Sequence, residues 1–227
     1  MTWRVLTWNL HGSADPDVAA IAERLGDARI DVAALQEVRR SQAHLLARLL
    51  GWHVVWRRKH YPYSPLVWWR AEGLAIASRH ALSETERHTL SSGEPIWIYR
   101  HRIMLSATVH RGAESLRVHD VHLASDSADS RIEQARRAAS IVARRASVVN
   151  VVCGDLNAND EPEVLREFHA VDVRDTGGDC TSPAHSPQQR LDYVLVPSDS
   201  REAESSTPDG GDDWAALSDH LPVIVEF

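Results

Sequence analysis

Five short stretches of this chain carry side chains that can bind a metal ion or a phosphate group. They are Trp8-Asn9-Leu10-His11-Gly12, Leu35-Gln36-Glu37-Val38, Gly154-Asp155-Leu156-Asn157, Leu191-Asp192-Tyr193 and Asp219-His220-Leu221-Pro222. Each places a carboxylate, an amide or an imidazole beside an apolar run that is typical of a buried strand. We therefore expect the five stretches to meet in one site at the rim of a sheet.

The acids and amides in these stretches are suited to a hard divalent cation. Glu37, Asp155 and Asp219 offer the oxygen ligands that Mg²⁺ or Mn²⁺ prefers, and these ions commonly leave positions open for a phosphate. Asn9 and Asn157 are neutral groups that can orient a carboxylate or a phosphate oxygen. This combination predicts a metal site that faces a phosphate ester.

The imidazoles add proton chemistry to that site. His122 and His220 can hydrogen-bond charge that develops on phosphorus, or can move a proton. Asp192 could hold one of these rings in a fixed tautomer, as the acid of a catalytic triad does. Together the groups would serve metal-assisted attack of water on phosphorus.

Apolar periodicity predicts the elements that must position these groups. Strands are predicted over residues 3–8, 30–35, 52–56, 74–77, 103–109, 116–123, 148–153, 190–196 and 221–227. Helices are predicted to start at Asp15-Pro16, to run from Ser41 to Gly51, and to cover 129–145 and 162–168. Residues 57–71 and 84–100 are predicted to be irregular, and 198–213 to be a mobile surface loop. We expect two packed sheets flanked by helices.

Bulk composition limits the class of protein. The chain has 227 residues, 43% of them hydrophobic, which predicts a single domain over 1–227. A net charge of −7 argues against a protein held on nucleic acid by a broad basic surface. Cys153 and Cys180 make neither a disulfide framework nor a zinc set. We expect a cytoplasmic protein, because the chain shows no signal-peptide pattern and no apolar run near the roughly 20 residues of a membrane span.

The motifs, taken in order, resemble the endonuclease/exonuclease/phosphatase superfamily of DNase I-like, metal-dependent phosphoesterases. The resemblance runs from residue 3 to residue 227, and its most specific parts are Gly154-Asp155-Leu156-Asn157 and Ser218-Asp219-His220. It implies an α+β fold, a four-layer α/β/β/α sandwich of two mostly antiparallel sheets flanked by helices.

The resemblance also implies a role for each matched residue. Glu37 would be the principal ligand of Mg²⁺ or Mn²⁺, supported by Asn9 and Asp219. Asp155 would position or deprotonate the attacking water, and Asn157 would steady the phosphate.

The same resemblance assigns His220, paired with Asp192, to the scissile phosphate. His122 would be a second phosphate contact or an acid. The family often has Asn two residues before this last histidine, where this chain has Asp120. The extra carboxylate could alter metal affinity or could face elsewhere.

Aromatic and basic residues in the irregular segments are candidates for substrate binding. Trp69, Arg70 and Trp97 could stack on a base or clamp an organic group, although ordinary loop packing explains them equally well. The basic runs 57–60 and 100–102 could contact additional phosphates, and a solvated surface is the alternative.

These features predict a monomeric, divalent-metal-dependent phosphodiesterase that acts on a phosphate ester, with nucleic acid and nucleotides as candidate substrates. One alternative is a phosphomonoesterase of a small phosphorylated metabolite or nucleotide, which the acidic net charge favours. Another is a catalytically silent protein that binds a phosphate ligand on the same scaffold.

Overall fold

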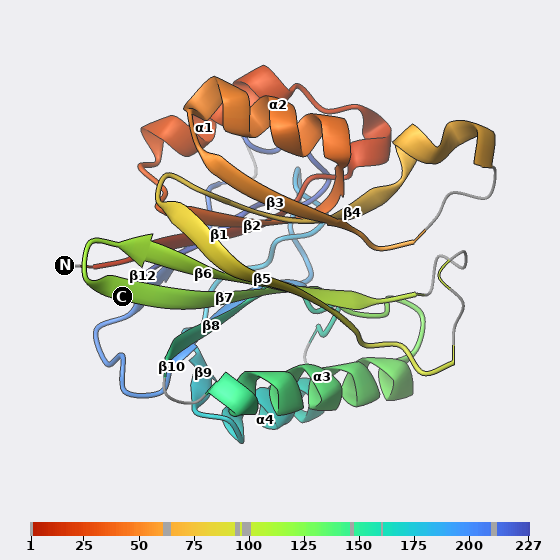
Figure 1. Ribbon diagram of the computed structural model, residues 1–227. Helices are drawn as coiled ribbons and strands as arrows, with labels where there is room; N and C mark the ends of the chain where they lie inside the picture. The colour runs from red at the N-terminus through yellow and green to blue at the C-terminus, as the bar shows by residue number, and fades with distance from the viewer. Residues whose placement is uncertain are drawn as a thin grey trace.

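Two six-stranded sheets pack face to face, and helices cover the outer face of each sheet (Figure 1). The computed structural model describes residues 2–60, 65–93, 96, 101–145, 148–159, 161–209 and 213–227. Helices α1 (Val18–Asp27) and α2 (Arg40–Leu50) lie on the first sheet, and α3 (Ala128–Val142) and α4 (Pro162–His169) lie on the second. The predicted four-layer α/β/β/α sandwich is confirmed. No helix among the described residues is long and apolar enough to cross a membrane.

The first sheet has the strand order β11-β12-β1-β2-β4-β3. Its strands are β1 (Arg4–Asn9), β2 (Val32–Arg39), β3 (His53–Arg58), β4 (Glu72–Ser78), β11 (Glu204–Ser206) and β12 (Val223–Glu226). Only β1 and β2 pair in parallel; the other pairs in this sheet are antiparallel.

The second sheet has the order β5-β6-β7-β8-β10-β9. Its strands are β5 (Ala81–Thr89), β6 (Ile103–Arg111), β7 (Glu114–His122), β8 (Val149–Asp155), β9 (Val173–Asp175) and β10 (Asp192–Pro197). Here β7 and β8 form the parallel pair. Three short 3-10 helices, η1 (Gly12–Ala14), η2 (Pro65–Arg70) and η3 (Ala143–Arg145), complete the described elements.

The structure corrects several of the predicted boundaries. Helix α1 begins at Val18 rather than at Asp15-Pro16, because Asp17 is the N-cap and its Oδ1 accepts the N–H groups of Ala19 and Ala20. Strand β5 covers the first part of the segment predicted to be irregular at 84–100, and β11 lies inside the predicted loop 198–213. Both are edge strands with few apolar residues, so backbone pairing forms them without the usual alternation.

The inner faces of β1, β2, β7, β8 and β10 are apolar for most of their length and become polar at one end. Side chains alternate across a strand, so every second residue points between the sheets. Val5, Val32, Val118, Val151 and Val194 belong to this inner core. On the same faces the sequence continues with Thr7, Asn9, Gln36, Asp120, His122, Asp155 and Asp192. The sandwich therefore holds a buried polar region at the end of its hydrophobic core.

Asp120 faces Gln36 inside this polar region. Gln36 Nε2 donates to Asp120 Oδ1 at 2.7 Å, from one sheet to the other. Asp120 is fully buried, and burial raises the pKa of its carboxyl group well above the usual range. A protonated Asp120 offers one donor and one acceptor, as the amide of Asn does. In the part of the chain that the structure describes, Asp120 Oδ2 and Gln36 Oε1 have no other hydrogen-bond partner.

The Asp120→Asn variant tests this protonation state. Because the folded-state pKa of Asp120 is raised, folding binds a proton, and stability falls as pH rises from about 4 towards the folded pKa. We expect Asp120→Asn to remove this fall, so that its stability advantage grows with pH by at most about 1.4 kcal/mol per pH unit. Urea unfolding of both proteins from pH 5 to 9 measures the difference. Parallel pH profiles would contradict a protonated Asp120.

Candidate active site

The predicted site residues of the two sheets meet at the end of the sandwich away from the chain termini (Figure 1). Asn9 Nδ2, at the end of β1, donates to Asp155 Oδ2, at the end of β8, at 3.0 Å. His122, the last residue of β7, places Nε2 3.6 Å from Asp155 Oδ2 and Nδ1 3.8 Å from Glu37 Oε1. These contacts join β1, β2, β7 and β8 in one cluster, as the sequence predicts.

A β-bulge in β2 directs Glu37 towards this cluster. Leu35 pairs with Ala75 and Val38 pairs with Gly73, so Gln36 and Glu37 together oppose a single residue of β4. Glu37 has φ of 53°, a left-handed conformation that is uncommon for a residue with a side chain. Without the bulge, strict alternation would point Glu37 towards the helices. The bulge instead lets its carboxylate approach His122 on the other sheet.

Gly12 packs directly against the bulge. A Cβ atom at this position would lie 2.3 Å from the carbonyl oxygen of Glu37 and 2.6 Å from Gln42 Oε1. Gln42 Nε2 also donates to Gly12 O at 3.0 Å. The backbone of η1 therefore fixes the bulge only because residue 12 has no side chain.

Asp192 and His220 form a buried pair beside Asp155. Asp192 Oδ2 lies 2.8 Å from His220 Nδ1 and accepts the hydroxyl of Thr181 at 2.6 Å. Burial opposes a charge on His220, but the charge and hydrogen bond of Asp192, with Asp155 and Asp219, outweigh it and raise the pKa of His220 to about 10. The imidazole is thus a cation near neutral pH. Trp8 Nε1, which donates to His220 O at 2.7 Å, anchors its backbone.

The second histidine, His122, is uncharged where His220 is charged. Burial lowers the pKa of His122 well below its usual range, and the nearby cations Lys59, Arg102 and His220 lower it further. His122 is therefore a neutral imidazole near neutral pH. Its ring lies between the carboxylates of Glu37 and Asp155.

Asp155 is held by partners on both of its oxygen atoms. Besides Asn9 on Oδ2, the backbone N–H of Asn157 donates to Oδ1 at 3.0 Å. Burial, and then the neighbouring charge of Asp192, raises the pKa of Asp155 to about 7. The side chain of Asn157 donates to Leu123 O at 3.2 Å and so lies beside the end of β7. Asp155 is thus a carboxylate that can exchange a proton near neutral pH.

The sequence model of the Endonuclease/Exonuclease/phosphatase family matches residues 6–220 of this chain. The chain belongs to this family. None of the curated proteins matches the chain.

Solved structures confirm the fold of the family. An endonuclease/exonuclease/phosphatase family protein from Leptotrichia buccalis C-1013-b superposes with a TM-score of 0.78 at 16% identity, over 98% of each chain. A mannosyl-6-phosphatase from Bacteroides thetaiotaomicron VPI-5482 gives 0.77 at 17% identity, also over 98% of each chain. A humanized TDP2 of D. rerio gives 0.70 at 16% identity, over 100% of this chain and 98% of that one. At these identities the likeness concerns the fold.

Two groups of side chains could hold the divalent cation that this family implies. Asp155, Asp192 and His220 offer ligand atoms within 4.8 Å of one another. However, Asp192 and His220 are hydrogen-bonded to each other. His220 is protonated near neutral pH, and a protonated imidazole cannot bind a metal. The set predicted from the sequence, Glu37, Asn9 and Asp219, offers the oxygen ligands that Mg²⁺ or Mn²⁺ prefers, and its two carboxylates keep 24% and 53% of their side-chain surface exposed.

Asp219 is connected to this set through neighbouring residues rather than through Glu37. Its Oδ2 lies 3.1 Å from His11 Nδ1. The hydroxyl of Ser218 donates to Asn9 O at 2.6 Å and links the segment to β1. The carboxylate of Asp219 is therefore at the same rim as Asn9 and remains open to solvent.

Two cations of the basic runs 57–60 and 100–102 are buried beside the site, although neither was predicted as a catalytic or metal-binding residue. Lys59 and Arg102 are only 4% and 3% exposed, so the solvated-surface alternative is wrong for both. Lys59 follows Val55 and Arg57 at alternate positions of β3 and its extension, on the face that points between the sheets. That alternation is the signal that could have identified Lys59.

The predicted substrate-binding residues lie apart from the contacts of the catalytic cluster. Trp69 is 56% exposed and meets Trp68 edge to face, with ring centroids 6.4 Å apart. Arg70, also exposed, ends η2, which projects beyond the sheets at the site end (Figure 1). Trp97 lies outside the described residues. Substrate contact by these residues therefore stays a prediction.

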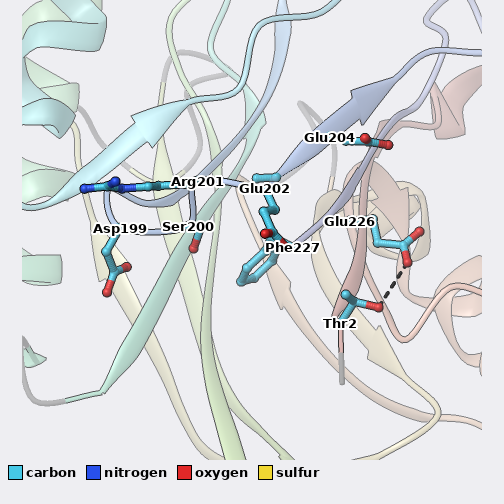
Figure 2. A pocket seen from close by; sticks show the side chains of 9 residues that line it. Thr2, Asp199, Ser200, Arg201, Glu202, Glu204, Glu226 and Phe227 are labelled. Atoms are coloured by element: carbon cyan, nitrogen blue, oxygen red, sulfur yellow. Dashed lines mark hydrogen bonds between the residues drawn. The ribbon is translucent and has the colours of Figure 1, made fainter.

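A separate cavity of about 480 Å³ lies at the other end of β1 (Figure 2). Thr2, Glu202, Glu226 and Phe227 are among its lining residues, and Thr2 Oγ1 donates to Glu226 Oε1 at 3.0 Å. None of the predicted catalytic or metal-binding residues lines it. The cavity is distinct from the family's site and does not bear on its chemistry.

The Gly12→Ala variant tests how the bulge supports the predicted metal ligand. The new methyl group must displace the backbone of Glu37, and loss of such support typically weakens metal affinity about 10- to 100-fold. We expect this loss for Mn²⁺, measured by calorimetric titration. Gly26→Ala is the matched control, because its Cβ would meet only Leu50 Cδ2 at 3.7 Å. Equal Mn²⁺ affinity in all three proteins would exclude a supporting role for Gly12.

Proposed function

We propose that this protein is a divalent-metal-dependent phosphoesterase that hydrolyses P–O bonds by attack of water. The observation that carries the proposal is the convergence of Asp155, a neutral His122 and a charged His220 within one buried cluster. These groups combine a proton acceptor with a fixed positive charge, which hydrolysis of a phosphate ester requires.

Glu37, Asn9 and Asp219 would hold the divalent cation, which would supply positive charge for the phosphate oxygens and the attacking water. Glu37 is the central ligand of this proposal, because the bulge turns its carboxylate away from the helices and towards His122 on the second sheet. Asn9 would offer its side-chain oxygen, which accepts the N–H of His11 at 3.1 Å, because its amide nitrogen donates to Asp155.

Asp155 is the proposed acceptor of the proton from water. Its pKa of about 7 lies near the working pH, which is where a general base is most effective. The hydrogen bonds from Asn9 and Asn157 fix the orientation of its carboxylate. Asn157 steadies the phosphate beside it.

The two histidines contact the scissile phosphate in different ways. His220 carries a full charge opposite Asp192 and stabilises the negative charge that develops on the phosphate oxygens. His122 is neutral, so its low pKa favours a hydrogen-bonding role over that of a general acid.

A phosphodiesterase, with nucleases among the candidates, is the leading form of this proposal. Two imidazoles near the phosphate can serve both a non-bridging oxygen and the leaving oxygen of a diester. A phosphomonoesterase of a small metabolite is the second candidate, and the fold-level likeness to a mannosyl-6-phosphatase favours it. The costly burial of Asp155 and Asp192 argues against a silent binding protein.

The first prediction concerns the proposed base. Asp155→Asn should lower the rate by about 10²- to 10⁴-fold, the usual contribution of a general base, while leaving the fold intact. The assay compares an aryl phosphodiester and its monoester with Mg²⁺, with Mn²⁺ and with chelator. Asp199→Asn, on an exposed loop, is the matched control. Retained activity in Asp155→Asn would disprove the role given to Asp155.

The second prediction concerns the charge of His220. Asp192 is the main group that raises its pKa to about 10, so the charged form exists below that pH and is lost above it. Asp192→Asn removes the charge of the partner, and the pKa should fall towards its ordinary value of about 6.5. The alkaline limb of kcat should therefore move to lower pH. NMR titration of the His220 ring checks the same shift directly, and an unchanged limb and titration would refute the assignment.

A further inference from the structure

The edge strands β3 and β5 meet at one corner of the sandwich, beside the site. Arg57 Nη2 of the first sheet donates to Thr85 Oγ1 of the second at 3.4 Å. Arg87 Nε of the second sheet donates to Arg58 O of the first at 3.4 Å. Basic side chains from both sheets therefore cluster at this corner. The corner lies next to the start of β6.

Lys59 is a buried cation of this corner. Its backbone N–H donates to Glu72 O at 3.0 Å, which extends the pairing of β3 and β4 by one residue. Its side chain is almost fully buried, and in the described part of the chain no carboxylate forms an ion pair with it. Burial and then Arg102 lower the pKa of Lys59 to about 8, whereas Glu37, Glu72 and Asp155 raise it. A buried ammonium without a direct counter-ion is costly and is suited to an anionic ligand.

Among the described residues, two buried ring nitrogens near Lys59 have no hydrogen-bond partner. They are His60 Nδ1 and His122 Nδ1. Lys59 and Arg102 each act on both rings, since their charges help to lower the pKa of both histidines. The corner thus presents a buried ammonium and polar nitrogens whose bonding capacity is unused.

Lys59 lies on the opposite side of the site from His220, although the charges of both residues act on the His122 ring. Strand β3 lies on the far side of β4 from β2, so two strand spacings of about 4.8 Å each separate it from the strand of Glu37. His220 and Asp192 lie on the opposite side, next to β12 and in β10. A phosphate bound at Lys59 would therefore lie beside the phosphate that His220 contacts.

We propose that Lys59, with Arg102 beside it, binds a second phosphate group of the substrate, adjacent to the one that is hydrolysed. This inference rests on the proposed phosphoesterase function and narrows its substrate class. The substrate then carries two phosphates a few bonds apart. They can belong to a small bisphosphorylated molecule or to neighbouring positions of a short nucleic acid strand.

A binding experiment tests the subsite without turnover. Calorimetric titration with inorganic phosphate and with inorganic pyrophosphate, in the presence of chelator, compares the parent with Lys59→Met and Lys59→Arg. We expect the parent to prefer pyrophosphate by about tenfold, Lys59→Met to lose this preference, and Lys59→Arg to keep it. Arg201→Met, on the far cavity, removes a charge without touching the corner. An unchanged preference in Lys59→Met would overturn the proposal.

A kinetic experiment identifies the source of the second phosphate. Matched pairs are 5′-phosphorylated and 5′-hydroxyl dithymidylate, and a hexose bisphosphate and its monophosphate, each with Mg²⁺ or Mn²⁺. A preference for the doubly phosphorylated member in either pair, abolished in Lys59→Met, supports the subsite and names its source. If Lys59→Met lowered the hydrolysis rate equally for both members of a pair, Lys59 would only balance the charges of Glu37 and Glu72. That result would overturn the proposal. If the parent protein binds pyrophosphate but hydrolyses none of these substrates with Mg²⁺ or Mn²⁺, the proposed function would instead be refuted.

Discussion

The hydrogen bond from Asn9 to Asp155 joins the two sheets at the point where their shared apolar core gives way to polar groups. Its two residues stand 146 positions apart, so the site exists only when both sheets have formed and packed. Burial of a charge in this polar region costs free energy unless the charge has a partner. The neighbouring contacts of His122, Asp192 and His220 satisfy that requirement, and they set the distances on which the chemistry depends.

The same burial separates the protonation states of chemically identical groups. His220 is charged because Asp192 is 2.8 Å away, whereas His122 is neutral because burial acts together with nearby cations. Burial raises the pKa of Asp120, which faces Gln36, and so favours the neutral form, whose donor and acceptor match those of an asparagine amide. The buried polar region therefore holds a cation, a neutral imidazole and a neutral acid, and the immediate partners of each group set its protonation state.

The elements that the sequence predicts well are those with strong apolar alternation or clear caps. The strands that carry Asn9, Asp155 and Asp192 contain runs of valine and leucine, and Gly51 ends α2 in a left-handed conformation as expected. Strands β5, β9 and β11 were missed, because edge and three-residue strands gain their stability from backbone pairing with a neighbour. Local sequence does not record which neighbour will be present.

The sequence by itself determined the family, the layered fold and the identity of the polar residues, because strand alternation and motif order are local properties of the chain. Only the tertiary structure decided where those residues point and which of them are charged. The bulge that turns Glu37, the inter-sheet bond of Asp120 and the burial of Lys59 all arise from residues distant in sequence. Their energies depend on desolvation and on partner distances, and neither quantity exists until the two sheets have packed together.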